Sequence, residues 1–312
     1  MNQKTKIVTG AALILVSLGV LLVWQSLSLG KLRFIFCDVG QGDTILIITP
    51  DGKQILVDGG LGSKVVDCLS SHMPFWDRSV EMVINTHPQQ DHLEGLVSVL
   101  EKYEVGMIAT NGVVNSTNLY GQWEKAVKKE EGPKGTEGSK GTKGAKMYTA
   151  KAGDKLILDQ GSAYSRVAPL TMEVLWPPAD KIENWQKEPP KDLNVSSIIV
   201  RISYGPPAGG FCAYLTGDIP KEILETVADK QCQILKVTHH GSKTGTNEQL
   251  LAKIKPKIAV IQVGKNNRFG HPHKEVLDLL ASRNIKVLRN DLSGTIEVDV
   301  GREGIRVKTQ KK

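Results

Sequence analysis

The sequence predicts a mixed α/β fold with β-sheet on both sides of a hydrophobic core. Short apolar runs of strand length are separated by glycine turns, and stretches with helical spacing of apolar residues lie between several of them. The chain ends in two alternating strands around a glycine turn. Strands and helices therefore mix along the whole chain, which is typical of layered α/β proteins. A chain of 312 residues is long enough to bury a substantial core.

The first part of this pattern predicts three strands joined by tight turns. These are the runs "LRFIFCDVG", "DTILIITPDG" and "KQILVDGG", which span residues 32–60. Asp51-Gly52 between two apolar runs is a strong hairpin signal. A fourth strand, "EMVINT", precedes a stretch at residues 92–103 whose leucines and valines recur with helical spacing.

The second half repeats the alternation of strands and helices. Four apolar runs predict strands, at residues 196–205, 211–218, 232–241 and 257–264. Two helices are expected between and after them, at residues 221–229 and 275–284. The final run, residues 294–309, reads as two strands around a glycine turn.

The N-terminus predicts a membrane anchor at residues 1–30. Lys4 and Lys6 precede a run from Ile7 to Gly30 without any charge, and roughly 20 apolar residues cross a bilayer core. Trp24 suits the membrane interface. We expect a single-pass protein of the cell membrane with its large domain, residues 31–312, outside the cytoplasm. The alternative is secretion after cleavage of a signal peptide.

The amino-acid composition limits the binding partners and the cellular compartment that the protein is expected to have. The net charge of +7 favours acidic partners such as nucleic acid or anionic lipid. The four cysteines include no C-x-x-C pair, which excludes zinc-finger and thioredoxin-like sites. A disulfide outside the cytoplasm is possible, but the sequence does not assign which cysteines pair. Residues 128–146 contain glycine at every third position over five triplets and predict a flexible basic surface loop.

Six of the seven histidines fall into three close pairs, each at or soon after the end of an apolar strand. The pairs are His87 with His92, His239 with His240, and His271 with His273. Strand ends are where rigid scaffolds display catalytic groups. The run "YLTGD" places a carboxylate, Asp218, in the same kind of position.

These residues predict a metal-dependent hydrolase. Such a site needs neutral imidazoles and carboxylates that converge from different strands and leave coordination positions open. The candidates that supply this set are His87, Asp91, His92, Asp218 and one of His239 or His240. The remaining aspartates of the glycine turns, Asp38, Asp43 and Asp58, are expected to stabilise those turns or to support the ligands.

The chain resembles the metallo-β-lactamase-fold domain of the ComEC/Rec2 competence proteins. The resemblance rests on six motifs in the family's order: "DVGQGDTILI", "ILVDGG", "THPQQDHLEGL", "LTGD", "KVTHHGSKTGT" and "GKNNRFGHPH". It implies an αβ/βα sandwich in one domain over about residues 32–300, with metals at one edge between two sheets. It also implies a nuclease acting on DNA outside the membrane. The family's competence proteins have many membrane spans, whereas this chain has one candidate.

The resemblance implies two metal positions of unequal strength. One is held by Asp91, His92, Asp218 and the His239/His240 pair; the other uses His87, position 89 and a bridging Asp218. Relatives usually carry aspartate where this chain has Gln89. Opposite charges about 4 Å apart interact by roughly 4 kcal/mol at an effective dielectric near 20, so the amide weakens the second position.

The expected cofactor is therefore a divalent metal, Mn²⁺ or Zn²⁺, in one strong and one weak site. Because adjacent strand residues point to opposite faces, one histidine of the 239/240 pair is expected to bind metal, with His240 favoured. Asp91, His239 and His271 are the expected catalytic residues; His239 would lie near the substrate. His271 and His273 would position phosphate or protonate a leaving group.

Two other functions remain open at this point. One is hydrolysis of small-molecule or cell-surface phosphodiesters, for which a single anchor near a surface is suitable. The other is a catalytically weakened binding module, for which the substitution at Gln89 is the argument. No nucleotide cofactor is expected for any of the three.

Overall fold

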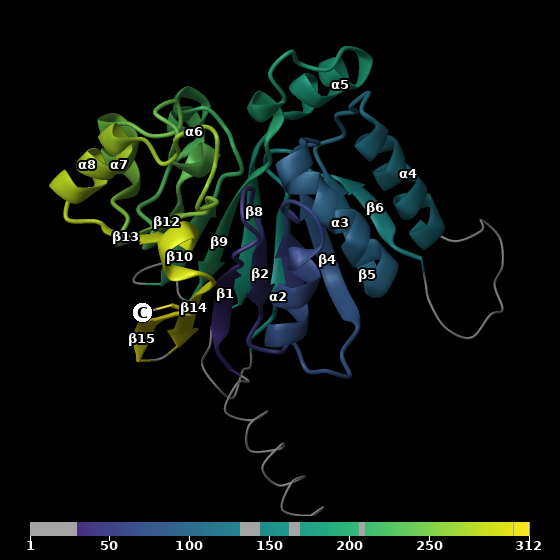
Figure 1. Cartoon of the computed structure of the whole chain (residues 1–312), viewed down its shortest axis with the longest axis horizontal. Coiled ribbons are helices and arrows are strands. Elements are labelled where there is room, and N and C mark those ends of the chain that lie inside the picture. The colour runs from purple at the N-terminus through teal and green to yellow at the C-terminus, as the bar shows by residue number, and fades with distance from the viewer. Residues whose placement is uncertain (1–29, 132–143, 162–168, 206–209, 302, 312) are drawn as a thin grey trace, which may run out of the picture.

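The computed structural model describes residues 30–131, 144–161, 169–205, 210–301 and 303–311 (Figure 1). The expected anchor at residues 1–30 lies outside these residues except for Gly30. Over the described ranges, no helix combines the length and apolar character that crossing a bilayer requires.

Two β-sheets form the centre of the molecule. In spatial order, the strands of the first sheet are β15 (Gly304–Thr309), β14 (Ile296–Gly301), β1 (Leu32–Phe36), β2 (Ile45–Ile48), β3 (Gln54–Val57), β4 (Ser79–Asn85), β5 (Glu104–Thr110) and β6 (Lys146–Thr149). Those of the second are β13 (Lys286–Arg289), β12 (Ile258–Ile261), β11 (Ile234–Lys236), β10 (Phe211–Leu215), β9 (Ile199–Tyr204), β8 (Leu170–Trp176) and β7 (Lys155–Asp159).

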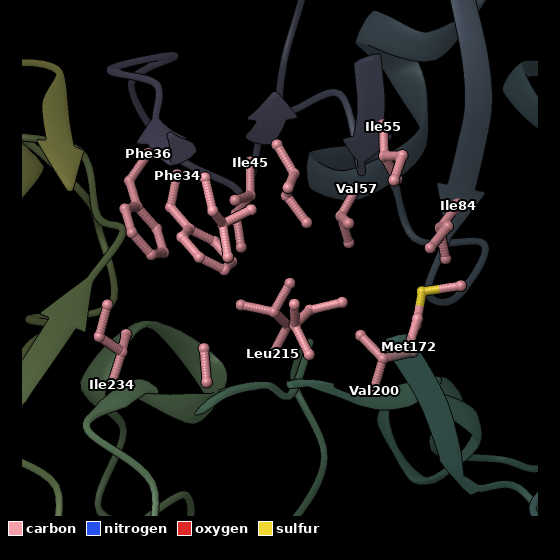
Figure 2. Packing of buried hydrophobic residues seen from close by; sticks show 14 of the residues in the cluster. Phe34, Phe36, Ile45, Ile55, Val57, Ile84, Met172, Val200, Leu215 and Ile234 are labelled. Carbon is pink, nitrogen blue, oxygen red and sulfur yellow. The ribbon is translucent and has the colours of Figure 1, made fainter. Parts of the chain in front are cut away.

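The two sheets face each other across the main hydrophobic core. Phe34 and Phe36 of β1 point into this space, where they meet residues of the second sheet such as Leu215 and Ile234 (Figure 2). Ile35, between the two phenylalanines, belongs to a separate core on the other face of its sheet. Because successive side chains of a strand point to opposite faces of the sheet, β1 contributes residues to both cores.

Helices cover the outer face of each sheet (Figure 1). The helices of the first sheet are α2 (Lys64–His72), α3 (Gln90–Lys102) and α4 (Asn118–Glu131). Those of the second are α6 (Lys221–Val227), α7 (Glu248–Ile254) and α8 (Lys274–Ser282). The remaining helices are α5 (Ala179–Lys187), the short α9 (Asn290–Ser293) and the 3₁₀ turns η1 (Leu193–Ser196) and η2 (Thr238–Gly241). The result is the expected helix–sheet–sheet–helix sandwich.

The elements expected from the sequence are present, and several others were not anticipated. The Asp51-Gly52 hairpin joins β2 to β3, with Gly52 at a φ of +91°. The elements that the pattern missed are β5 to β8, β13, α2, α4, α5 and α7. Strands such as β6 and β7 lie at sheet edges with mixed exposure, so their apolar periodicity is weak. Of the loop expected at residues 128–146, residues 128–131 belong to α4, and residues 132–143 lie outside the described residues.

All four cysteines pair. One disulfide joins Cys37, just after β1, to Cys68 in α2, and the other joins Cys212 in β10 to Cys232 just before β11. The pairing left open by the sequence is thus decided by the fold. The first bridge lies just after β1, whereas the second joins the beginnings of β10 and β11, at the end of these strands away from Asp218 and His240.

Strand direction places the candidate site loops at one edge. In the first sheet β3 and β4 are parallel, so the loops that follow them begin side by side. In the second sheet β10, β11 and β12 are parallel, so the loops after them also gather at one end. Parallel strands commonly carry binding residues at these carboxyl ends.

Candidate metal centre

Loops from both sheets bring the candidate ligands together. Asp91 and His92 lie in the first turn of α3, which follows β4. Asp218 follows β10, and His240 lies in η2 after β11. The ligand atoms of these four residues all lie within 4.8 Å of one another. Their sequence positions are far apart, so the two facing sheets create the cluster.

The four side chains converge on one point. His240 Nε2 lies 3.2 Å from Asp91 Oδ2 and 3.3 Å from Asp218 Oδ2. His92 Nε2 also lies 3.3 Å from Asp218 Oδ2, yet it makes no hydrogen bond in proper geometry. All but Asp91 are buried. This arrangement of two imidazoles and two carboxylates is one that a divalent cation would satisfy.

Hydrogen bonds from behind fix both imidazole rings. His92 Nδ1 pairs with Asp58 Oδ2 at 2.8 Å, and His240 Nδ1 donates to the Gln262 carbonyl at 2.8 Å. Each ring therefore presents Nε2 to the cluster, the pattern by which outer partners orient metal-binding histidines. Asp58 also accepts hydrogen bonds from the backbone and hydroxyl of Thr86.

The aspartates of the glycine turns are expected to stabilise those turns or to support the ligands, and the structure shows both kinds of contact. Asp38 accepts a hydrogen bond from the backbone of Gly40. Asp58 instead supports His92, and Asp43 lies 3.4 Å from His240 and pairs with Lys236. The turns bring these two side chains under the cluster, where buried cationic partners outcompete the local backbone.

Lys236 is the functional candidate that the sequence interpretation missed. This fully buried lysine in β11 pairs with Asp43, donates to the Gly217 carbonyl at 2.8 Å and lies 3.6 Å from Asp218 Oδ1. A lysine inside the apolar run "QILKV" was the available signal, because lysines are almost never fully buried without a partner. Its ammonium group offsets part of the negative charge of the surrounding carboxylates.

The charges of the cluster depend on one another. Burial opposes the charged form of His92, but the Asp218 and Asp58 carboxylates outweigh it and raise the pKa of His92 well above its ordinary value. The pKa of His240 is raised in the same way, chiefly by Asp218 acting against burial. A bound metal ion would replace the extra protons on His92 and His240, so the carboxylates of the cluster attract either protons or a metal ion.

His87 lies beside the cluster without being part of it. Its ring centroid is 4.2 Å from that of His92, and its Nε2 is buried without a hydrogen-bond partner. Burial, and then the charge of His92, lowers the pKa of His87 to about 3, so the ring is neutral. A neutral imidazole with an unpaired nitrogen is a suitable metal ligand.

Gln89 stands at the start of α3, two residues before Asp91. It is the N-cap residue of α3, is partly exposed, and forms no cap hydrogen bond through its side chain. Its backbone carbonyl accepts hydrogen bonds from His92 and Leu93. The two potential ligands of the expected second site thus differ in exposure: His87 is buried beside His92, whereas Gln89 is partly exposed.

The histidine pair lies in a turn rather than on a strand. β11 ends at Lys236, and His239 and His240 both adopt left-handed backbone conformations, with φ of 51° and 54°. Strand alternation therefore does not separate the two side chains. The turn does so instead: His240 joins the cluster, while His239 is half-exposed with Nδ1 3.5 Å from Thr244 Oγ1. Such backbone strain in non-glycine residues is concentrated at functional sites.

Two further histidines extend the site outward. The rings of His271 and His239 are 5.6 Å apart, and those of His271 and His273 are 4.9 Å apart. Burial, with the charge of His240, lowers the pKa of His271 to about 4. His271 is therefore neutral near pH 7 and suited to accept a proton or a hydrogen bond rather than to protonate a leaving group.

The chain is similar in sequence to several known proteins. ComE operon protein 3 of Bacillus subtilis (strain 168) is 29% identical over 292 residues, covering 83% of this chain and 32% of that protein. Exodeoxyribonuclease YycJ of Bacillus anthracis is 28% identical over 85 residues, covering 27% of this chain and 32% of the relative. The match thus spans about a third of the length of either relative. No protein-family model matches the chain.

Among solved structures, the metallo-β-lactamase-fold protein YhfI from Bacillus subtilis superposes with a TM-score of 0.50 at 12% identity. The match covers 86% of this chain and 99% of YhfI. This likeness concerns the fold alone. The resemblance to the ComEC/Rec2 competence proteins is confirmed, and the chain has a two-sheet fold of the metallo-β-lactamase type.

Proposed function

We propose that this protein is a membrane-anchored, metal-dependent phosphodiesterase that acts on DNA. The observation that carries the proposal is the convergence of Asp91, His92, Asp218 and His240, from three separate segments, on a space no wider than 4.8 Å between ligand atoms. Relatives with a metallo-hydrolase fold support the general class.

The residues present fit a divalent cation. Buried His92 Nε2 and Asp218 Oδ1 lack hydrogen-bond partners, and both belong to the proposed ligands. Oxygen and nitrogen ligands without thiolate suit Mn²⁺ or Zn²⁺. When bound, the cation supplies Lewis-acid stabilisation of negative charge and activates water for attack on a phosphodiester. His239 and His271 at the rim hold the phosphate and accept protons.

One strong and one weak metal position remain our proposal. Asp218 turns Oδ2 toward His92 and His240, while Oδ1 lies 3.6 Å from Lys236. The lysine therefore stands near the oxygen that a bridging carboxylate would offer to a second cation. Together with the neutral amide at position 89, this weakens the position beside His87.

Two observations support DNA as the substrate class. Relatives are named as a competence protein, a recombination protein and an exodeoxyribonuclease. The net charge of +7 favours a polyanionic partner. The two disulfides support a location outside the cytoplasm, because such bonds persist in oxidising compartments. We place the anchor in residues 1–30.

The test compares metal content and hydrolysis in the purified full-length chain. Wild type should bind about one tightly held Mn²⁺ or Zn²⁺ and cleave DNA. Asp218→Asn and His240→Gln should lose both properties, whereas His72→Gln, a histidine in α2 remote from the cluster, should retain both.

Metal-free wild-type protein that still cleaves DNA would refute the metal site. Hydrolysis of bis-p-nitrophenyl phosphate without any cleavage of DNA would assign the substrate to small-molecule or cell-surface phosphodiesters. Absence of stoichiometric metal together with absence of hydrolysis would indicate a binding module.

A further inference from the structure

The loop after β12 carries an exposed aromatic side chain next to the candidate metal centre. Phe269 is 50% exposed, and its ring stacks on that of His271, with centroids 5.7 Å and planes 25° apart. The ring of His271 lies in turn 6.4 Å from that of His240. Phe269 is thus separated from a proposed metal ligand by a single imidazole.

Asn267 holds this loop in one conformation. Its side-chain oxygen accepts hydrogen bonds from the backbone of Phe269 at 3.2 Å and of His271 at 2.9 Å. Its side-chain nitrogen donates to the carbonyls of Gly264 and His271. A side chain on a loop fixed in this way loses little conformational freedom when it binds a ligand.

One cation lies against the aromatic ring, and two more are exposed in the same pair of loops. The guanidinium carbon of Arg268 lies 5.2 Å from the Phe269 centroid, and Lys265 and Lys243 are exposed nearby in the same pair of loops. In the part of the chain that the structure describes, none of these three cations forms a salt bridge, in contrast to Arg283, which pairs with Glu248. They are therefore available for phosphates.

A single exposed phenylalanine is ordinary on a protein surface. The stacking of Phe269 on an imidazole at the site, its fixed loop and the cations around it together indicate a ligand with a flat face and a negative charge. A nucleotide with an unpaired base has both properties. Base–aromatic stacking of this kind is how proteins hold single-stranded nucleic acid without sequence preference.

We propose that Phe269 is a nucleobase-stacking subsite that, with Arg268 and Lys265 on the flanking phosphates, places a single-stranded DNA segment beside the metal centre. This inference rests on the proposed function, since it names the form of DNA that the site takes. It predicts a preference for single strands and frayed ends over intact duplex, because a paired base is not free to stack on the ring.

Binding without catalysis tests the subsite. The full-length chain in EDTA is titrated with oligodeoxynucleotides in which 2-aminopurine occupies each position in turn. Wild type should quench the fluorescence of one or two neighbouring positions. Phe269→Ala should bind about 5- to 100-fold more weakly and lose that quenching. Phe269→Trp should restore both.

The matched control is Phe75→Ala, which removes a phenylalanine that is 79% exposed. Phe75 lies in the loop before β4, whereas His87 follows the other end of that strand. This variant should behave as wild type. Equal affinity and quenching in Phe269→Ala would overturn the subsite, and so would an absence of DNA binding by wild type. If wild type quenches the fluorescence but cleaves no DNA after metal is restored, the stacking subsite at Phe269 is retained and the proposed nuclease activity is rejected.

Discussion

At the scale of the residue, Lys236 sets the charge of the candidate metal centre. It is buried beside Asp43 and Asp218, and its ammonium group joins His92 and His240 as a cationic partner of these carboxylates in the absence of metal. Burial disfavours its charge, but Asp43 and Asp218 outweigh this effect and raise the pKa of Lys236. The site is therefore prearranged by an internal cation before a metal arrives.

Replacing this lysine should destabilise the metal-free protein. Lys236→Met leaves two buried carboxylates with fewer cationic partners. Breaking a buried ion pair in this way lowers the free energy of unfolding by about 3–5 kcal/mol. Denaturant unfolding in EDTA would measure the loss, and added Mn²⁺ should recover more stability in the variant than in wild type. Lys257→Met, an exposed lysine just before β12, is the control. Equal unfolding midpoints for the two variants would contradict the role assigned to Lys236.

We propose that Gln89 limits the number of metals the site holds. Gln89→Asp supplies a negative charge at the proposed second position and should raise the metal content from about one toward two per chain. Elemental analysis of the dialysed protein would measure it. Gln90→Asp adds the same charge one residue further, on an exposed side chain that contacts Glu94, and should leave the stoichiometry unchanged. Two tightly bound metals in wild type would show that the sites were ranked wrongly.

At the scale of the element, α3 is held against the turn after β3 by a close glycine contact. Gly59 donates its backbone N–H to the His92 carbonyl at 2.7 Å, and Gly95 donates to the Gly60 carbonyl at 3.0 Å. A Cβ on Gly95 would lie 2.0 Å from the Gly59 carbonyl oxygen. The start of α3, which carries Asp91 and His92, is positioned by this contact.

Gly95→Ala should therefore move the helix away from the sheet. We expect a loss of about 1–3 kcal/mol in unfolding free energy, as for other overpacking substitutions, together with weaker metal binding. Gly121→Ala in α4 meets no atom within 4 Å and should stabilise the chain slightly, because alanine favours the helix. If both substitutions left metal affinity unchanged, α3 would not be positioned by this contact.

The strands β1, β14 and β15 share a charge cluster with its own pH dependence. Burial raises the pKa of Glu297, but its hydrogen bond with Asp299 and the charges of Arg33 and Lys308 outweigh burial and lower it to about 2. A depressed carboxyl pKa stabilises the fold above the unfolded value near 4.5, and this contribution disappears as the pH falls toward 2.

Glu297→Gln should lower stability at pH 7 by on the order of 1–2 kcal/mol and by nothing at pH 2. Unfolding curves across this range would show it. Glu303→Gln removes a carboxylate that is 95% exposed in the adjoining hairpin and should have no such pH-dependent effect. A pH-independent loss in Glu297→Gln would show that packing, not ionisation, is responsible.

At the scale of the whole molecule, two disulfides connect the elements that surround the site. Cys37 precedes the turn that carries Asp43, and Cys232 precedes the strand that carries Lys236. The bridges close intervals of 31 and 20 residues. In an oxidising compartment they restrict the unfolded chain and thereby favour the assembled site.

The protein purified without reductant should show no free thiol, even when unfolded. Reduction, or the double variant Cys37→Ala/Cys68→Ala, should lower the unfolding free energy by about 2–4 kcal/mol. Maleimide labelling and denaturant unfolding measure the two outcomes. Thiols that react in the unreduced, unfolded protein would show that the bridges do not form in the cell.

The sequence by itself determined part of the strand and helix pattern and the identities of the proposed ligands. The periodicity of strands and helices is a local property of the sequence, so it predicted β1 to β4, α3 and β9 to β12. The histidines and aspartates at strand ends stood out for the same reason: each is a polar group directly after an apolar run. The motifs around Asp91, His92, Asp218 and His240 carried the resemblance that the comparisons confirm.

Only the tertiary structure decided which partner each of these side chains takes. Asp43 pairs with Lys236, Asp58 orients His92, the cysteines form two particular bridges, and a left-handed turn separates His239 from His240. These contacts join residues that are distant in the chain, and they exist because two sheets pack face to face with their site loops at one edge. Local pattern contains no information about that pairing, since it depends on sheet order and on the burial of charge between the layers.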